Sequence, residues 1–184
     1  DTQFHNFQRA CSLAKEAGIS LKWKHLANSA ATLTRPEAHF NMVRPGIAVY
    51  GVHPGNAPSD LRPVMRVVSR VIQVKSVPAG TPISYGQSFV TERPSRIAMV
   101  PIGYADGYSY ALANRAQVLV RGQRASAIVA VCMDVTVIDV TDLPAVSVGD
   151  EVVLWGQQGE DRITVHDIAA WQGSSPYEVL TRLG

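Results

Sequence analysis

Apolar residues recur at helical spacing near the start of the chain. Phe7, Ala10 and Ala14 fall three and four positions apart, which predicts an amphipathic helix over residues 2–17. Gly18 follows where a left-handed C-cap is expected, because glycine adopts that conformation without a steric penalty. The chain therefore opens on a helix that a glycine ends.

An extended pattern and a second, shorter helix come next. Leu21, Trp23 and His25 alternate as residues on one face of a strand do. A short helix is predicted over residues 29–33, and Pro36 brings it to an end. The order helix, strand, helix, strand favours parallel strands joined by crossover helices.

Composition then divides the chain into parts. Residues 1–55 are interpreted as the last, incomplete α/β units of a TIM-type barrel, whose site lies at the C-terminal ends of its strands. Residues 56–63 are rich in Pro, Asn, Ser and Asp, which predicts a linker. Residues 64–184 carry short β-rich segments separated by turn signals and are predicted to form an antiparallel β domain. Its expected extended segments are residues 64–77, 96–102, 117–121, 124–131, 135–140 and 151–155.

Two helix starts are expected near the end of the β domain. Thr164 and Asp167 match a capping box, and Ser175 with Pro176 is typical of a further helix N-terminus.

Composition and charge narrow the function classes. A content of 46% hydrophobic residues in 184 supports a packed globular fold. The formal charge of +2 comes without a basic run, which argues against nucleic acid as a partner. No apolar run reaches the length of a membrane span, and nothing resembles a signal peptide. Because the chain begins at Asp1 without Met and enters a helix directly, we expect it to be part of a longer protein.

The two cysteines indicate a reducing compartment. Cys11 and Cys132 lie far apart and show no zinc-ligand spacing, so no metal site is expected. A reduced chain in the cytoplasm is the default, and a disulfide stays open.

Polar groups gather where the two predicted strands of the first part end. In HLANSAA, Asn28 and Ser29 can cap the following helix, and a hydroxyl beside free amides forms an anion site. In FNMVRPGI, Arg44 precedes Gly46 and Ile47, where a bend can turn backbone amides toward the same anion.

Plain structural roles compete with each of these assignments. On the residues alone, Arg44 is more often a salt bridge or a snorkelling side chain. For Ser29 and Gly46, capping or turn geometry is the commoner explanation. His25 is as well explained as a satisfied histidine at a strand end. Tyr104, which follows an apolar strand in GYADG, is taken singly more often a buried core tyrosine.

Four motifs in order, the first of them in two parts, carry a family resemblance. HLANSAA, followed about fifteen residues later by FNMVRPGIAVYG, then PIGYADGY, VCMD and PYEVL, resembles the alanine racemase family over nearly the whole chain. These racemases depend on pyridoxal phosphate (PLP). The resemblance implies that the complete protein interconverts L- and D-alanine for cell-wall precursors.

The resemblance assigns roles to five residues of the first part. It implies that Ser29, by its hydroxyl, and Gly46 and Ile47, by their amides, hold the phosphate. Arg44 would face the pyridine nitrogen and keep it unprotonated, which favours reprotonation over transamination. His25 would support Arg44 by a hydrogen bond.

It also assigns residues of the β domain to a shared site. Tyr104 would be the catalytic acid/base for one face of the substrate and would reach into the active site of the other subunit of a homodimer. Met133 would contact the substrate carboxylate through its backbone amide. A phenol has a pKa near 10, so this role needs a cationic or polar setting.

The family's Schiff-base lysine is not in this chain. Its lysines are Lys15, Lys22, Lys24 and Lys75, and none lies in the family's VKADAYG type of setting. We therefore expect this segment alone to be inactive, and we expect the family's phosphate-binding tyrosine after YEVL to fall beyond Gly184.

Departures from the family pattern leave the substrate range open. Val129 and Ala130 replace Gly and Arg before VCMD, and Tyr110 stands where a cation is usual. Two fewer positive groups near the substrate path change the attraction for substrate. The alternatives are a racemase with a broad amino-acid range and a non-catalytic β-rich dimerisation or binding module.

Overall fold

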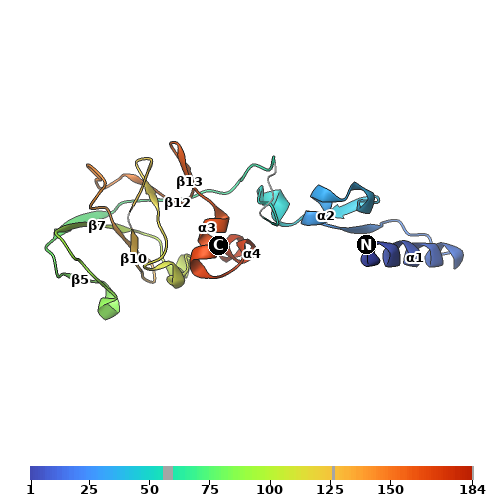
Figure 1. The fold of residues 1–184 in the computed structure, drawn as a ribbon, viewed down its shortest axis with the longest axis horizontal. Coiled ribbons are helices and arrows are strands. Elements are labelled where there is room, and N and C mark those ends of the chain that lie inside the picture. Colours follow the sequence, from blue (N-terminus) through green and yellow to red (C-terminus); the bar gives the residue numbers. More distant parts are fainter. Residues whose placement is uncertain (56–59, 126, 184) are drawn as a thin grey trace. The chain divides into compact units, whose positions relative to one another are not determined.

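The computed structural model describes residues 1–55, 60–125 and 127–183, which divide into two compact units, Asp1–Val64 and Met65–Gly184 (Figure 1). The predicted linker at residues 56–63 falls partly outside the described residues, because 56–59 are not among them.

The first unit is a short α/β segment. Its strands β1 and β2 pair in parallel, as the alternation of helices and strands predicts. In order, its elements are α1 (Thr2–Glu16), β1 (His25–Asn28), α2 (Ser29–Thr34), the 3-10 helix η1 (Pro36–Ala38), β2 (Met42–Arg44) and the 3-10 helix η2 (Ile47–Tyr50).

Helix α1 ends as expected and strand β1 starts later than expected. Gly18 has φ +74°, and the amide of Ile19 reaches back to the carbonyl of Ala14 at 2.9 Å. The predicted strand from Leu21 is wrong, because β1 begins only at His25. The side chain of Asn41 takes the place of a strand partner here: its Oδ1 accepts from the Lys24 amide at 2.7 Å, and its Nδ2 donates to the Lys22 carbonyl at 2.9 Å.

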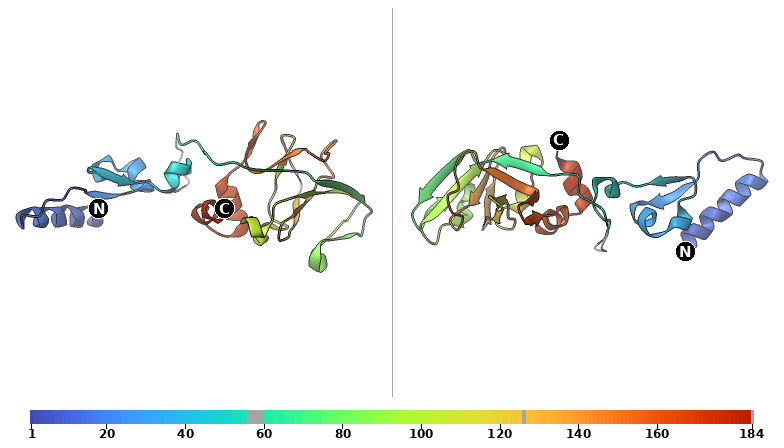
Figure 2. Two further views of the ribbon diagram at one scale, coloured as in Figure 1. Left: turned by 180° about the vertical axis from the view of Figure 1, so that it is seen from behind. Right: turned by 90° about the horizontal axis from the view of Figure 1, so that it is seen from above.

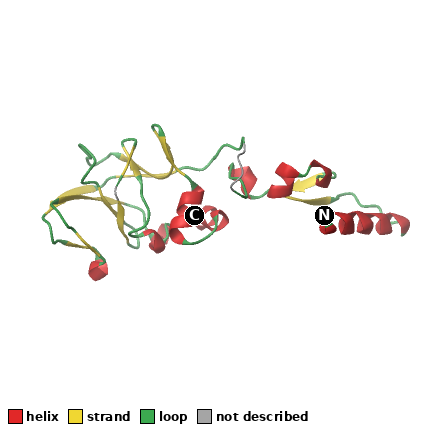
Figure 3. Ribbon diagram, viewed as in Figure 1, coloured by secondary structure: helices red, strands yellow, loops and turns green. Residues whose placement is uncertain are grey.

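The second unit is built from antiparallel strands, as predicted (Figure 3). One sheet has the order β10-β11-β7-β4, a second runs β13-β12-β8-β9 with β3 also paired to β12, and β5 and β6 form a separate pair. The strands are β3 (Val67–Arg70), β4 (Gln73–Val77), β5 (Pro82–Ile83), β6 (Phe89–Val90), β7 (Ser95–Val100), β8 (Leu119–Val120), β9 (Gln123–Arg124), β10 (Ala127–Val131), β11 (Thr136–Asp139), β12 (Glu151–Gln158) and β13 (Asp161–Ile163).

The predicted segment at residues 64–77 is in fact two strands. It breaks at Val71 and Ile72, where the Val71 amide bonds to Asp150 and the Ile72 amide to Met99. The chain passes there from the second sheet to the first, and Val71, 1% exposed, packs inside. A continuous β-like pattern therefore hides a change of sheet.

Two helices close the second unit and lie side by side (Figure 2): α3 (Val165–Gln172) and α4 (Pro176–Arg182). The predicted capping box is confirmed, because the Asp167 amide donates to the Thr164 hydroxyl at 3.1 Å and the Thr164 amide donates to the Asp167 carboxylate at 2.7 Å. Ser175 caps α4 by accepting from the Glu178 amide at 3.3 Å. Trp155 on β12 lies in the core at 2% exposure.

Candidate functional site

In the first unit, a hydroxyl and two backbone amides meet between helix α2 and the turn after β2. Asn28 caps α2 by accepting from the Ala31 amide at 3.0 Å, so the neighbouring Ser29 hydroxyl is left for other partners. Its Oγ accepts from the amide of Gly46 at 2.8 Å and from the amide of Ala48 at 3.4 Å. Ser29 is 4% exposed.

We call Ser29, Gly46, Ile47 and Ala48 the amide cradle. Ile47 lies between the two donating residues, is the first residue of η2 and is buried. All of these donors are neutral, and neutral N–H and O–H groups that converge suit a phosphate oxygen. Of the three residues that the sequence assigns to phosphate, Ser29 and Gly46 are bonded to each other and Ile47 follows Gly46 in the chain, while the second bonded amide belongs to Ala48.

Arg44 and His25 lie on the two neighbouring strands of the same unit. Both side chains are exposed within this chain, so Arg44 has room for a partner. The Arg44 guanidinium donates to the carbonyl of Leu26, the residue after His25, at 3.3 Å. Arg44 pairs in register with Asn28, so its backbone lies beside the start of the cradle.

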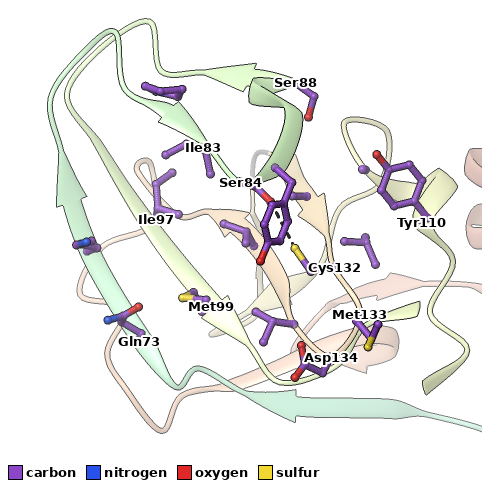
Figure 4. A pocket seen from close by; sticks show the side chains of 18 of the residues that line it. Gln73, Ile83, Ser84, Ser88, Ile97, Met99, Tyr110, Cys132, Met133 and Asp134 are labelled. Atoms are coloured by element: carbon purple, nitrogen blue, oxygen red, sulfur yellow. Dashed lines mark hydrogen bonds between the residues drawn. The ribbon is translucent and has the colours of Figure 1, made fainter. Parts of the chain in front are cut away.

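In the second unit, a pocket of about 980 Å³ opens between the first sheet, the β5–β6 hairpin and the turns at residues 104–113 and 132–135 (Figure 4). Figure 4 shows Ser84 and Ile83 on one wall, Cys132, Met133 and Asp134 on another, and Tyr110 at the edge. The pocket contains both residues that the sequence assigns to this domain's chemistry, Tyr104 and Met133.

Tyr104 sits on a tight turn bonded to the segment that carries Met133. The amide of Tyr104 donates to the Cys132 carbonyl at 2.9 Å and the amide of Ala105 to the Met133 carbonyl at 2.8 Å. A Cβ on Gly103 would lie 2.3 Å from both carbonyl oxygens, so only glycine permits this approach. The motifs GYADG and VCMD, about thirty residues apart in the sequence, are therefore one structural unit.

Tyr104 and Met133 are both accessible from the pocket. Tyr104 is 46% exposed, and its ring lies edge-on to that of Tyr110, with 6.5 Å between the ring centroids. The next tyrosine in the motif, Tyr108, is 1% exposed, and burial raises the pKa of its phenol far above the ordinary value. Tyr108 is thus a core residue, whereas Tyr104 is available to solutes.

A third phenol in the pocket, that of Tyr85, is not anticipated from the sequence. Tyr85 is 88% exposed and lies on the 3-10 turn η3 (Tyr85–Gln87) at the tip of the β5–β6 hairpin. Its neighbours Ser84 and Gln87 have φ of +64° and +50°, conformations that cost non-glycine residues free energy and recur at functional sites. The available signal was a tyrosine flanked by turn residues in ISYGQS, which is too short to show any periodicity.

The described residues hold no group of three or more His, Cys, Asp or Glu side chains that could bind a metal ion. Cys11 and Cys132 are both free thiols. Among the helices of the described ranges, none is long and apolar enough to cross a bilayer.

The sequence matches two family models, described as "Alanine racemase, N-terminal domain" over residues 1–54 and "Alanine racemase, C-terminal domain" over residues 64–184. The alanine racemase of Desulfovibrio desulfuricans is 46% identical and covers 99% of this chain, which covers 49% of that protein. Alanine racemase 2 of Caldanaerobacter subterraneus subsp. tengcongensis is also 46% identical, over 96% of this chain and 46% of the relative. The chain thus spans about half the length of the curated relatives it matches.

Solved structures give the same result. Alanine racemase from Bacillus anthracis with bound L-Ala-P has 38% identity and a TM-score of 0.90, over 99% of this chain and 48% of that one. The Clostridium difficile 630 enzyme in complex with cycloserine has 36% identity and a TM-score of 0.90, over 100% of this chain and 49% of that one. The Bartonella henselae enzyme with covalently bound pyridoxal phosphate has 35% identity and a TM-score of 0.83, over 98% of this chain and 50% of that one.

This likeness confirms the predicted fold class, in which the terminal α/β units of a TIM-type barrel precede an antiparallel β-rich domain. The two family models together cover both units of the chain, and the motifs that carry the resemblance fall inside them. The chain belongs to the alanine racemase family.

Proposed function

We propose that the complete protein is a PLP-dependent racemase that interconverts L- and D-alanine. The observation that carries this proposal is the amide cradle, in which a buried serine hydroxyl meets two backbone amides in a chain of this family. In the same proposal the enzyme works in the cytoplasm and supplies D-alanine for cell-wall precursors.

The residues of the first unit fit the cofactor. The cradle offers only neutral donors, which bind a phosphate dianion without a mobile countercharge. The space beside Gly46 is open, since the atom nearest to a Cβ built there would be Ser29 Oγ at 4.0 Å. In this proposal Ser29, Gly46 and Ile47 hold the phosphate. When bound, the pyridine ring withdraws electrons from the substrate Cα and makes its proton removable.

Arg44 sets the protonation state of the ring nitrogen in this proposal. A guanidinium stays charged and only donates hydrogen bonds, so a nitrogen that faces it must accept and stay unprotonated. That limits how far charge at Cα is delocalised, and the proton returns to Cα quickly. His25, on the adjacent strand, supports the orientation of Arg44.

A phenol from the second unit takes and returns the proton on one face of Cα. The sequence assigns this role to Tyr104, but the geometry favours Tyr85. Tyr104 has half its surface covered and its ring rests on Tyr110, whereas Tyr85 stands almost free at the tip of a hairpin with strained backbone. A group that must reach Cα from its own domain has to project from it, and Tyr85 projects further.

The exposure of these groups supports a homodimer with shared sites. Tyr85, Tyr104 and Met133 are exposed in this chain, yet proton transfer at Cα needs a site from which water is excluded. We propose that the pocket closes against a second copy, whose substrate carboxylate meets the backbone amide of Met133.

The test is racemisation by the complete protein with PLP, with Tyr85→Phe compared to Tyr104→Phe. Loss of the acid/base phenol is expected to lower kcat by about 10²–10⁴-fold, and loss of a lining phenol by far less. Exchange of the α-proton of each enantiomer in D₂O shows which face is affected. Absence of racemisation in the wild-type protein would reject the function, and a much larger loss in Tyr104→Phe would return the role to Tyr104.

A broader substrate range is the second candidate, favoured by the pocket lining. Ala130 and Tyr110 line it where cations are usual in the family, and uncharged walls accommodate side chains other than a methyl group. Turnover of alanine, serine and lysine by the complete protein compares the two. If instead PLP does not bind at all, the protein is a non-catalytic β-rich module.

A further inference from the structure

We propose that Thr91 is a positioning residue that holds the phenol of Tyr85 in the pocket. The inference rests on the proposed function above, in which Tyr85 moves the proton at Cα. Thr91 itself does not line the pocket and is 2% exposed.

Residues 78–91, which we call the arm, form a hairpin with very little ladder. Strands β5 and β6 have two residues each, and their register pairs are Pro82 with Val90 and Ile83 with Phe89. Proline has no N–H to donate, so the ladder alone leaves the arm weakly tied. Tyr85, at its tip, needs some other constraint.

The Thr91 side chain supplies that constraint at the base of the arm. Its hydroxyl donates to the Pro78 carbonyl at 2.8 Å and accepts from the Thr81 amide at 2.9 Å. The Thr91 backbone adds a bond from its amide to the Thr81 carbonyl at 3.0 Å and one from the Gly80 amide to its own carbonyl at 2.6 Å. One residue thus joins both strands of the arm where they leave the domain.

Apolar contacts hold the arm against the first sheet but do not fix its direction. Ile83 and Phe89 pack on a buried cluster made of Ile97, Val129, Ala130 and Val137. Such contacts are non-directional, and a slip by one residue would move side chains to the opposite face. Hydrogen bonds at Thr91 oppose such a slip, because they are directional: its hydroxyl donates to the Pro78 carbonyl at 2.8 Å, with the Thr81 carbonyl a second acceptor at 3.4 Å, and accepts from the Thr81 amide at 2.9 Å.

A further contact links the tip to the residues around Met133. Ser84 directly precedes Tyr85 in the chain, and its hydroxyl lies 3.4 Å from the Cys132 sulfur (Figure 4). Ser84 keeps a φ of +64° to make this turn. The arm is therefore held at its base by Thr91 and aimed at the pocket by Ser84, and loss of the first removes the support for the second.

The experiment uses the complete protein with PLP and the variants Thr91→Val, Thr91→Ser and Thr91→Ala. Valine keeps the shape and removes the hydroxyl, so we expect kcat to fall about ten- to a hundredfold with little change in KM, because a misplaced group costs rate more than binding. Serine keeps the hydroxyl and should restore kcat to within about threefold of wild type. If the valine variant does not fold, the alanine and serine variants carry the same comparison.

The matched control is Thr141→Val. The Thr141 hydroxyl also bonds to backbone and side-chain groups, accepting from the Arg96 amide at 3.0 Å, but it lies outside the pocket lining. This variant should lose stability but keep wild-type kcat.

The double variant Tyr85→Phe/Thr91→Val decides whether Thr91 acts through Tyr85. If it does, the double variant is no slower than Tyr85→Phe, because the group to be positioned is already absent. Equal kcat in Thr91→Val and Thr141→Val, or additive losses in the double variant, would overturn the inference while leaving the racemase proposal intact. Absence of activity in the wild-type protein would instead overturn both.

Discussion

The two units differ in how much apolar surface each buries by itself. Among the described residues, helix α1 in the first unit buries no side chain, and the fully buried apolar residues of that unit are Ala27, Ala38, Ile47 and Val52. The second unit buries large side chains on β7, β8, β10, β11 and β12 and on both closing helices. Thus the unit with the amide cradle buries little apolar surface of its own, whereas the unit with the pocket carries its own core.

Separating the two units should have the largest effect on thermal unfolding. A peptide of residues 1–64 is expected to lack a cooperative thermal transition, since it has too little apolar burial to offset chain entropy. A peptide of residues 65–184 is expected to unfold in one cooperative transition. Circular dichroism on heating measures both, and a cooperative transition in the shorter peptide would remove the contrast.

Glycine substitutions should show the contrast at single positions. In Gly103→Ala, the new methyl group would overlap the carbonyl oxygens of Cys132 and Met133 at 2.3 Å, so the turn must shift, at a cost of about 1–3 kcal/mol. In Gly46→Ala the nearest atom is 4.0 Å away, and the stability of the chain should hardly change. Urea unfolding gives both values, and equal losses would show that Gly103 is not held by packing.

Helix caps should matter next. Asp167→Ala removes the capping box of α3 and should lower the free energy of unfolding by about 1 kcal/mol. Asn28→Ala removes the cap of α2 in the first unit, where unfolding of α2 is not coupled to a large core, so the main transition should stay in place. The midpoints of thermal unfolding compare the two variants.

The smallest effect is expected from ion pairs as pH changes. The Arg124 guanidinium, bonded to Asp161 at 2.8 Å, lowers the pKa of that carboxyl below its ordinary 3.8. A lowered folded-state pKa stabilises the protein above the unfolded-state pKa, and this contribution disappears as pH falls through the folded-state value. Asp161→Asn should therefore be less stable than wild type at pH 7, by under about 1 kcal/mol because the pair is partly exposed. The gap should close as pH falls through the lowered folded-state pKa of Asp161.

The control for this pH experiment is Glu37→Gln in the first unit. Arg35 lowers the pKa of Glu37 by a hydrogen bond, but both side chains are exposed, that of Glu37 to 48%. The unfolding curve should then not change at any pH. A gap between wild type and Asp161→Asn that stays constant with pH would show that the carboxyl acts through its shape and not its charge.

Local signals in the sequence predicted the elements that depend on local chemistry. Gly18, the Thr164 and Asp167 box, and Ser175 with Pro176 form bonds within a few residues of themselves, so their spacing is sufficient. The late start of β1 was missed because it depends on Asn41, which lies sixteen or more positions further along the chain.

The site was predictable to the extent that its groups sit in long motifs. The Gly46 amide bonds to the Ser29 hydroxyl, with Ile47 next to Gly46 in the chain, and Tyr104 and Met133 share one pocket. The sequence did not predict a role for Tyr85, because two-residue strands show no periodicity. The positive φ of Ser84 and Gln87 could not be predicted either, since neither residue is a glycine. A turn set by distant contacts, such as those of Thr91 and Cys132, is invisible to a pattern along the chain.

The different burial of Trp23 and Trp155 gives each unit its own fluorescence signal. Trp23, in the first unit, is 58% exposed and should fluoresce at long wavelength, whereas Trp155 is 2% exposed and should fluoresce at short wavelength together with the half-buried Trp171. A Trp23→Phe variant then reports on the β domain alone. The emission spectrum can follow, in one cuvette, which unit loosens first as denaturant is added.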